Sequence, residues 1–337
     1  MNRDTVLLAR ARALLGLPGG PAGELSRAEV ARAARAVSEL HDGLVGDRAL
    51  AQPGTYRGAR LGAYLLWWWP QTYARTQAAL RLFSPPQQPR ILDVGAGPGP
   101  AALAALDLLG GSAVCFDASE PALAEARALG VQETARELPA GPFDLTLAAN
   151  VLSELPDPAS LVRKLTGVVV LIEPALRETG RALLTLRDAL LASGEFRAIA
   201  PCFTQQPCPA LANARDWCTA EVRWNPPAFV RQLADATGLR ADEMLSYAPL
   251  VLTRAAIEQP APDVWRVVGV APPEKGKHRI WVCSDAGRVA AVRLDKQGAP
   301  ANEAFVELRR GDVVRLRNLQ QRGDGLRVGP DSTVEKR

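Results

Sequence analysis

Three of the five cysteines lie in one proline-rich segment, APCFTQQPCPALANARDWC, as Cys202, Cys208 and Cys218. Thiolates grouped in this way bind a metal ion or an iron–sulfur cluster, form a disulfide, or carry redox chemistry. An odd number of cysteines in a reducing compartment argues against a disulfide framework. Cys115 and Cys283 lie far away in the sequence, and one of them could complete a four-thiolate site.

The spacing of these cysteines favours an iron–sulfur cluster. The segment lacks the paired C-x-x-C of structural zinc sites, whereas clusters accept more varied spacings and often carry a Cys-Pro step such as Cys208-Pro209. Cys283 is the better fourth ligand, because Cys115 lies in an apolar strand where a thiol is a small hydrophobe. A zinc site with His278 as fourth ligand is the alternative, and three unliganded thiols are the remaining one.

A second group of residues has the pattern of a nucleotide site. In ILDVGAGPGPAAL, Asp93 ends a predicted strand, and Gly95, Gly97 and Gly99 precede a predicted helix. Glycines let the backbone turn sharply and approach a ligand, and a helix N-terminus offers free N–H donors. The G-x-G-x-G spacing after an acid is that of class I S-adenosylmethionine (SAM) methyltransferases rather than the dinucleotide G-x-G-x-x-G.

Further residues belong to the same predicted pocket. Asp117 ends the next strand, where a carboxylate can accept both ribose hydroxyls of SAM or of NAD. After the fourth strand, Asn150 occupies the position that orients a target nitrogen in N-methyltransferases, but the Pro-Pro-aromatic that usually follows is missing. Glu154 and Glu173 are the nearest carboxylates, so Asn150 and Glu154 are weak catalytic candidates, and the catalytic residues stay open.

The elements that would position these residues follow from hydrophobic periodicity. From Arg90, short apolar runs alternate with helical segments, which indicates an α/β fold with a doubly wound parallel sheet. Residues 1–85 are predicted to be helical, with Ser26 and Glu29 forming a capping box and Pro70 kinking or dividing a helix at about 58–83. The aromatic residues of that helix are expected to be core.

Domain boundaries are predicted from changes in composition. We predict a helical region at 1–85, a methyltransferase-like domain at 86–257 with a cysteine loop at 200–224, and a small β domain at 258–337 that begins at EQPAPD (258–263). Residues 261–337 hold 15 basic and 10 acidic residues, a net charge of +5, whereas the whole chain has +4. A polyanion is therefore expected to bind the C-terminal segment.

The motifs together resemble a known family. The ordered set NVLSELPDP, IEP, APC, PCP and DWC is similar to that of the methyltransferase-like small-ribosomal-subunit assembly proteins, which occur in bacteria and on the mitochondrial small subunit. The resemblance implies a class I methyltransferase (Rossmann-like) fold and a 4Fe–4S cluster held by Cys202, Cys208, Cys218 and Cys283. It also implies binding to small-subunit ribosomal RNA or its precursor particle.

The expected RNA contacts are basic residues of the C-terminal segment, namely Lys275, Lys277, Arg279, Arg309, Arg310, Arg315 and Arg317. The chain has no secretory pattern at its start and no apolar run of membrane-spanning length. We expect a cytoplasmic, ribosome-associated monomer with no membrane partner, or a mitochondrial one if the source is eukaryotic. Methyl transfer itself is not established by motif, and the alternative is a non-catalytic protein that binds SAM and RNA.

Overall fold

The structure is a computed structural model that describes residues 3–46, 57–202, 204–258 and 260–337. The chain forms two compact units. The first unit consists of residues 1–173 and 222–245, and the second of residues 174–221 and 246–337. Phe203 of the cysteine segment and Gln259 of the predicted 258–263 boundary lie outside the described residues.

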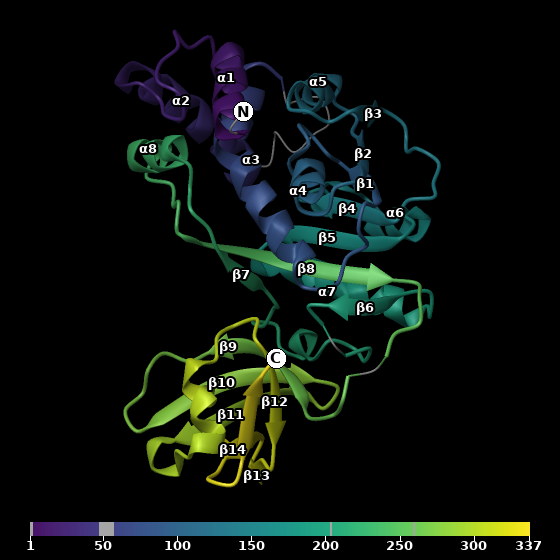
Figure 1. Cartoon of the computed structure of the whole chain (residues 1–337), viewed down its shortest axis with the longest axis vertical. Coiled ribbons are helices and arrows are strands. Elements are labelled where there is room, and N and C mark those ends of the chain that lie inside the picture. The colour runs from purple at the N-terminus through teal and green to yellow at the C-terminus, as the bar shows by residue number, and fades with distance from the viewer. Residues whose placement is uncertain (1–2, 47–56, 203, 259) are drawn as a thin grey trace. The chain divides into compact units, whose positions relative to one another are not determined.

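A parallel sheet forms the centre of the first unit (Figure 1). Its strands lie in the order β3-β2-β1-β4-β5, and every neighbouring pair is parallel, as predicted. Strands buried on both faces require nearly continuous apolar runs, which is why the segments RILDV and VVVLIEP have that composition. The bounds are β1 Arg90–Val94, β2 Ser112–Phe116, β3 Glu133–Ala135, β4 Leu145–Ala149 and β5 Val168–Pro174.

Short helices connect these strands, and each begins at a residue suited to end a loop. The helix α4 (Pro100–Leu109) starts after Gly99 with a proline in its first turn. Ser119 accepts a hydrogen bond from the Ala122 N–H at 3.4 Å and caps α5 (Glu120–Ala128). Asp157 does the same for the Ser160 N–H at 3.0 Å and caps α6 (Pro158–Lys164), after the short 3-10 helix η2 (Leu152–Glu154).

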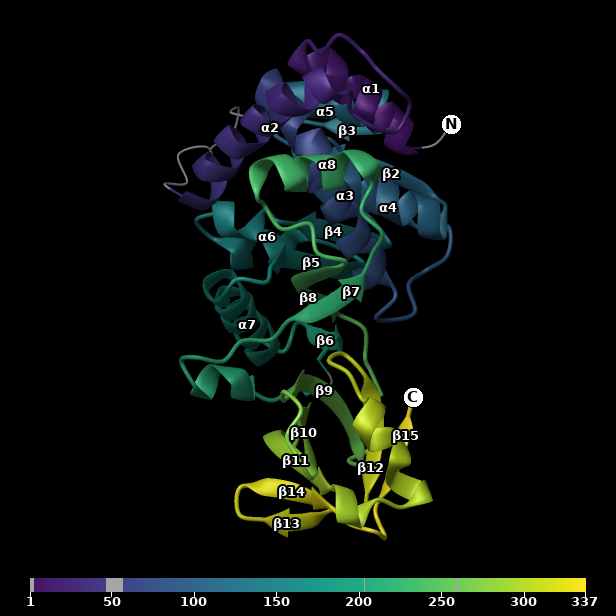
Figure 2. The same ribbon diagram turned by 90° about the vertical axis from the view of Figure 1, so that its left-hand side faces the viewer.

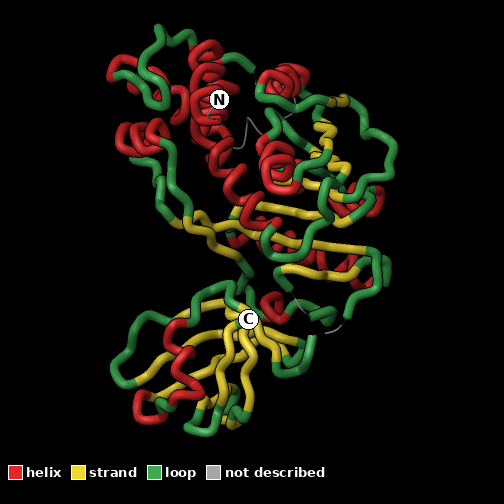
Figure 3. The backbone as a smooth tube through the Cα atoms, in the orientation of Figure 1, coloured by secondary structure: helices red, strands yellow, loops and turns green. Residues whose placement is uncertain are grey.

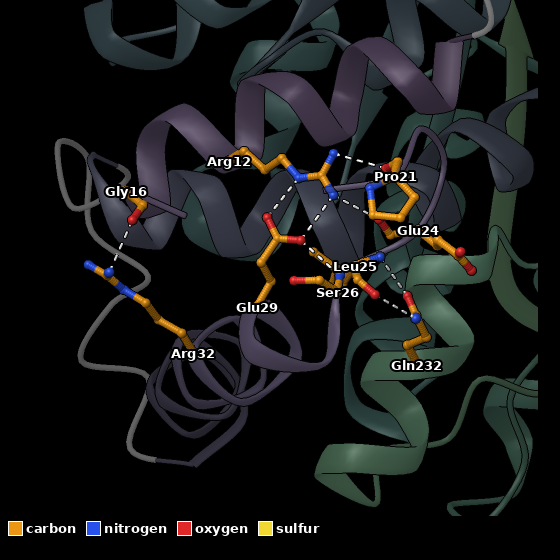
Figure 4. A network of polar contacts seen from close by, with 9 residues as sticks. All are labelled: Arg12, Gly16, Pro21, Glu24, Leu25, Ser26, Glu29, Arg32 and Gln232. Carbon is orange, nitrogen blue, oxygen red and sulfur yellow. Dashed lines mark hydrogen bonds and ion pairs between the residues drawn. The ribbon is translucent and has the colours of Figure 1, made fainter. Parts of the chain in front are cut away.

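The N-terminal helices are tied together by buried polar contacts (Figure 4). The predicted capping box of Ser26 and Glu29 is confirmed. The Glu29 side chain is fully buried and accepts from Arg12 Nε at 2.8 Å. Gln232 pairs twice with the Leu25 backbone, at 2.8 Å and 2.9 Å. The elements here are α1 Arg3–Leu15, α2 Arg27–His41, the π-helix η1 Asp42–Gly46, α3 Ala59–Leu80 and α8 Ala228–Thr237.

Pro70 is predicted to kink or divide the helix α3, and α3 runs without interruption through Pro70, so the proline does not divide the helix. Trp67 and Trp69 are buried at 4% and 1% exposure, which confirms their core role. Gly62 lets α3 approach α1, because a Cβ atom there would lie 2.8 Å from the Leu15 side chain. Burial along nearly the whole helix keeps it continuous at a position where an exposed helix would break.

The second unit begins with α7 (Arg177–Ala192) and contains the antiparallel pair of β6 (Arg197–Ala200) and β8 (Met244–Thr253). The cysteine segment follows β6 and includes one short 3-10 helix, η3 (Pro209–Ala212), before β7 (Ala220–Arg223). Figure 3 shows that the segment between β6 and β7 is mostly loop. Its position is therefore set by side-chain contacts rather than by a hydrogen-bonded ladder.

A seven-stranded sheet makes up the rest of the second unit (Figure 2). Its order is β13-β14-β11-β10-β9-β12-β15, around a core that includes Val267, Val282, Phe305 and Val328. Its pairs are antiparallel as predicted, except that β11 and β14 are parallel. The bounds are β9 Val264–Val270, β10 Lys277–Ser284, β11 Gly287–Leu294, η4 Asp295–Gln297, η5 Pro300–Glu307, β12 Val313–Arg317, β13 Gln320–Arg322, β14 Gly325–Val328 and β15 Thr333–Lys336. Among the described residues, no helix combines the length and apolar character of a membrane span.

Candidate functional site

The glycine loop has the strand, turn and helix order that the sequence predicts. Gly95, Gly97 and Gly99 have φ angles of +65°, +53° and +73°, which side-chain-bearing residues adopt only at a cost. A Cβ atom on Gly95 would lie 2.3 Å from Val151 Cγ2, whereas one on Gly97 would meet nothing within 4 Å. Gly95 therefore serves packing, and Gly97 leaves free space above the loop.

Asp93 supports this loop from the end of β1. Its side chain is 1% exposed and accepts a hydrogen bond from the Ala102 N–H in the first turn of α4 at 2.8 Å. Burial raises the pKa of Asp93 to about 7, and the nearby Asp117 carboxylate adds to the rise while the Ala102 bond opposes it. Asp93 thus positions the loop, because its buried carboxylate is hydrogen-bonded to the first turn of α4.

Asp117 lies beside the loop at the end of β2, as the sequence predicts. Its two carboxylate oxygens accept from the Gly97 N–H and the Ser119 N–H, both at 2.7 Å. The carboxylate therefore joins the glycine loop to the start of α5. A carboxylate oxygen has two acceptor positions, so these bonds leave capacity for ribose hydroxyls.

Asn150 follows β4 with a φ of +59°, a conformation that asparagine tolerates better than most residues. Its Nδ2 donates to Thr72 Oγ1 of α3 at 3.3 Å. Neither this contact nor the hydrogen bond that Trp69 Nε1 donates to the Pro98 carbonyl at 3.1 Å could be predicted from the sequence. Both contacts place α3 against the loops at the carboxyl ends of β1 and β4.

Two carboxyl groups near this edge have raised pKa values. Partial desolvation, together with the charges of Asp117 and Glu173, raises the pKa of Glu154 to about 7, although the residue as a whole is exposed. Burial raises the pKa of Glu173 to about 7, against the bonds that its carboxylate accepts from the Leu152 and Val151 backbone and from Ser153. Glu173 Oε2 is buried and has no hydrogen-bond partner among the described residues. Groups with such values can exchange a proton near neutral pH.

The four cysteines proposed as ligands line one pocket of the second unit. Cys202, Cys208 and Cys218 come from the segment after β6, and Cys283 comes from β10. Cys115 is fully buried in β2, in the first unit, as the sequence analysis expected. All five cysteines are free thiols.

Burial and mutual proximity disfavour ionisation of the thiols in this pocket. Burial, with the neighbouring thiols second, raises the pKa of Cys208 to about 11 and that of Cys283 to about 12. The pKa of Cys202 is also raised, mainly by burial, while the charges of Arg187 and Arg266 oppose the rise. A thiolate set here thus requires added positive charge.

Two buried arginines supply positive charge beside the thiols, and the sequence analysis missed both. Arg187 of α7 is fully buried, donates to the carbonyls of Thr204 and Gln206 and to Asp188, and keeps Nε without a partner among the described residues. Arg266 of β9 is 4% exposed, and its Nη1 donates to Cys218 Sγ at 3.1 Å. Arg266 is the single charged residue of the apolar strand VWRVVGV, and that composition is a local signal of its unusual position.

No three His, Cys, Asp or Glu side chains lie close enough to hold a single metal ion within the part of the chain that the structure describes. His278 is exposed and lies 3.4 Å from Asp295. It occupies the face of β10 opposite to Cys283, because residues five positions apart on a strand alternate in direction. His278 as a fourth zinc ligand is therefore a wrong prediction.

The basic residues predicted to contact RNA are distributed over the C-terminal segment, and several have acidic partners. Lys277 and Arg279 pair with Glu274, at 2.7 Å and 3.7 Å. Arg315 and Arg317 lie on one face of β12 and both pair with Asp263, at 3.3 Å and 2.7 Å. Arg310 donates to Thr219 Oγ1 at 2.7 Å and pairs with Glu221. Lys275 and Arg309 lie in loops.

With both sites described, comparison with known proteins identifies the family. The model of the family described as mitochondrial small ribosomal subunit Rsm22 matches residues 59–315, which is most of the chain. The chain belongs to the Rsm22 family. Its matched region includes the glycine loop, Asp117, Asn150 and all four cysteines of the pocket. A search of the curated proteins finds no match.

Solved structures similar to this member of the Rsm22 family include methyltransferases. The ribosomal protein L11 methylase of Lactobacillus delbrueckii subsp. bulgaricus is 17% identical, with 56% of this chain and 79% of that chain covered and a TM-score of 0.34. The putative RNA methyltransferase PH1948 of Pyrococcus horikoshii is 13% identical, with 68% and 97% covered and a TM-score of 0.34. These similarities are too distant to say anything of substrate, and the class I fold follows from the strand order of the sheet itself.

Proposed function

We propose that this Rsm22-family protein is a small-ribosomal-subunit assembly factor that binds SAM and ribosomal RNA and carries a 4Fe–4S cluster. The observation that carries the proposal is the pocket lined by Cys202, Cys208, Cys218 and Cys283, because residues from distant parts of one unit converge there. The family's description places its members on the mitochondrial small ribosomal subunit. By that relationship the protein works on ribosomes, in mitochondria if the source is eukaryotic.

The chemistry of the pocket suits a cluster better than a single ion. Four thiols are the ligand set that iron–sulfur clusters use, and a four-iron cluster separates its ligands more widely than one ion does. The buried guanidinium groups of Arg187 and Arg266 offset the negative charge that ligating thiolates bring. A bound cluster would supply a structural link or a redox-sensitive centre, and these four cysteines would hold it.

Anaerobic purification tests this part of the proposal. We expect iron and sulfide in the protein, and their loss when any one of the four pocket cysteines is replaced by Ser. Cys115→Ser is the matched control, because it removes a buried thiol outside the pocket and should leave the iron content unchanged. Stoichiometric zinc without iron or sulfide would contradict the cluster.

SAM binding is proposed at the Gly95–Gly99 loop, with the ribose on Asp117. The open space above Gly97 and the acceptor capacity of Asp117 support this placement. Asp117→Ala should weaken SAM binding by about 1.5–3 kcal/mol, the range for a hydrogen bond to a charged group. Asp157→Ala is the control, because it also removes an aspartate that accepts a backbone bond, at the start of α6. Calorimetry with equal SAM affinity in the two variants would contradict the placement.

Methyl transfer is a second candidate function, favoured by the pKa values near 7 of Glu154 and Glu173. A carboxylate of this kind could take a proton from a target nitrogen held by Asn150. Incubation with methyl-labelled SAM and small-subunit RNA tests it. Incorporation that is lost in Glu154→Gln, with SAM affinity retained, is the expected result for an enzyme, whereas a binding factor would show no incorporation.

RNA binding is proposed for the basic C-terminal segment, with Arg315 and Arg317 as one stripe on β12. Both arginines lie on one face and are partly exposed, at 26% and 46% of the side chain. Replacing both by Glu should weaken RNA binding. It should also flatten the slope of log K against the logarithm of the salt concentration by about 0.7–0.9 per lost contact, since each phosphate contact releases counterions. Unchanged affinity and salt dependence would make this stripe a solvated surface.

A further inference from the structure

The face of the C-terminal sheet that carries Arg315 and Arg317 on β12 has a more specific arrangement on the strands from β9 to β14. On β10, β11 and β14, residues that pair directly across strands lie on the same face, and residues two apart share that face. Cys283 pairs with Arg288 and Arg266, Trp281 pairs with Ala290 and Gly269, and Arg279 pairs with Val292, which in turn pairs with Arg327. Three rows of side chains therefore cross the sheet, and Trp281 occupies the middle row.

Trp281 packs against Gly269 of the neighbouring strand β9. A Cβ atom on Gly269 would be 3.3 Å from Trp281 Cε3 and 3.9 Å from Cδ2, so the indole packs over the bare backbone of this glycine. The register of β9 shifts between Trp281 and Val282, and this bulge is what places Gly269 opposite the tryptophan. Trp281 stays partly exposed. Among the described residues, it stacks on no other aromatic ring.

The rows on either side of Trp281 are basic. We call the side of β9, β10, β11, β14 and β13 that carries Trp281 the Trp281 face, and its partly or fully exposed basic residues are Lys277, Arg279, Arg288, Arg322 and Arg327. Arg266 lies in the row of Cys283 but is buried beside Cys218. No strand position that these registers place on the face is Asp or Glu. The acidic residues that reach it come from loops: Glu274 beside Lys277 and Arg279, and Asp216 beside Arg288 at 3.1 Å.

Arg327 gives a second sign that a partner belongs here. Its Nη1 is buried and has no hydrogen-bond partner among the described residues. Across the sheet, Arg279 keeps 36% of its side chain exposed, with its nearest acid at 3.7 Å. Two guanidinium groups in one row thus retain donors for an anion.

We propose that the Trp281 face binds single-stranded RNA, with one base stacked on Trp281 and the flanking phosphates on Arg279 and Arg327. The inference rests on the proposed ribosomal RNA partner and names the surface and the form of RNA that it takes. Stacking on a flat aromatic ring needs an unpaired base, whereas a duplex offers none. A sheet that combines such a ring with rows of cations is suited to a chain of alternating bases and phosphates.

The test measures binding of a labelled single-stranded oligoribonucleotide of mixed sequence to the full-length, anaerobically purified protein at several salt concentrations. Trp281→Ala should weaken binding by about 5–150-fold, the range for loss of one base–aromatic stack, and leave the salt dependence unchanged. Trp281→Phe should restore most of the affinity. The double variant Arg279→Gln and Arg327→Gln should instead flatten the slope of log K against the logarithm of the salt concentration by about 0.7 per lost contact.

Gly269→Ala is a matched variant that keeps the tryptophan and displaces its ring, and it should weaken binding less than Trp281→Ala does. Iron content and thermal unfolding of each variant verify that the cysteine pocket and the sheet are intact. Wild-type affinity for the oligonucleotide in Trp281→Ala overturns the proposal. The same affinity combined with lost binding to intact small subunits also overturns it and assigns the face to a ribosomal protein. Failure of the wild-type protein to bind any RNA at low salt would instead remove the proposed function itself.

Discussion

The glycine loop of the first unit and the cysteine pocket of the second unit differ in how far their polar groups are hydrogen-bonded within the protein. In the loop, Asp93 and Asp117 accept hydrogen bonds from backbone N–H groups of Ala102, Gly97 and Ser119 at 2.7–2.8 Å. In the pocket, the thiols face one another and two buried arginines, and Arg187 Nε has no partner among the described residues. The carboxylates of the loop are bonded within their own chain, whereas the pocket holds a buried donor, Arg187 Nε, that is unpaired among the described residues.

This difference means that the two sites respond differently to the loss of one side chain. The loop is held by short-range bonds within one strand–turn–helix unit, so it should tolerate changes elsewhere. The pocket is lined by the segment after β6, by β9 and by β10, while Arg187 bonds α7 to that segment and Arg266 bonds β9 to it. Perturbing either site should therefore leave the other almost unchanged, which the following variants test.

The largest effect is expected from Arg187→Met. It removes the donor for the Thr204 and Gln206 carbonyls and the cationic partner of Asp188, which keeps its bond from the Cys208 N–H, so the second unit should lose about 3–5 kcal/mol of stability. Denaturant unfolding and proteolysis of the cysteine segment measure it, and SAM affinity should not change. Arg197→Met is the control, since the bonds of the Arg197 side chain within the described residues are to the nearby Gly194 and Phe196 carbonyls. Equal losses in the two variants would show that Arg187 does not hold the pocket.

Gly95→Ala and Gly97→Ala separate packing from ligand space in the loop. Gly95→Ala brings a methyl group within 2.3 Å of Val151 at a φ of +65°, so it should destabilise the first unit by about 2–4 kcal/mol. Gly97→Ala meets no protein atom and should cost only about 1 kcal/mol of stability, yet its methyl group would occupy the space proposed for SAM. Thermal unfolding and calorimetric SAM titration measure the two effects. A Gly97→Ala protein that binds SAM normally would place the ligand elsewhere.

The smallest effect is a dependence of stability on pH at the N-terminal helices. Hydrogen bonding to Arg12 lowers the pKa of Glu29 to about 2. Because the folded value is below the unfolded value of 4.5, this bond stabilises the fold above pH 4.5 and is lost as the pH falls toward 2. Glu29→Gln should cost about 1–3 kcal/mol at neutral pH and less in acid, as measured by urea unfolding at several pH values. Glu39→Gln, on the exposed side of the same helix, should show no such trend, and a parallel loss in both variants would contradict the assignment.

The loop and the pocket also differ in how far the sequence alone could predict them. The glycine loop is contiguous, so its strand, its turn and the approach of Asp117 follow from one local pattern. Three of the cysteines could be grouped because they share one segment, and Cys283 could be chosen over Cys115 only because Cys115 lies in an apolar strand. Nothing local indicates that Cys283 reaches Cys218. Arg187 and Arg266 were missed because an arginine is usually on the surface, and their burial depends on tertiary packing.

The fold shows the same division between local and distant information. Helices with strong periodicity, such as α7, and apolar strands, such as β5, could be predicted from their own residues. The parallel pairing of β11 with β14 could not, because it joins residues separated by other strands and helices, and β14 is only four residues long. The hydrogen bond between Asn150 and Thr72 of α3 could not be predicted either, because it depends on how α3 packs and not on any spacing in the sequence.

The order in which the chain is made gives the division into units a further consequence. The first unit is completed only by residues 222–245, whose Gln232 bonds to Leu25, so it cannot close until residues 174–221, which include the cysteine segment, have been synthesised. Domains tend to fold as they emerge, from the N-terminus onward. Cys202, Cys208 and Cys218 are thus present before α8 reaches its helical neighbours, and Cys283 emerges after them all. The four-cysteine pocket can therefore form only after Cys283 has been synthesised. Until then, the nascent protein carries the other three pocket thiols without their fourth member.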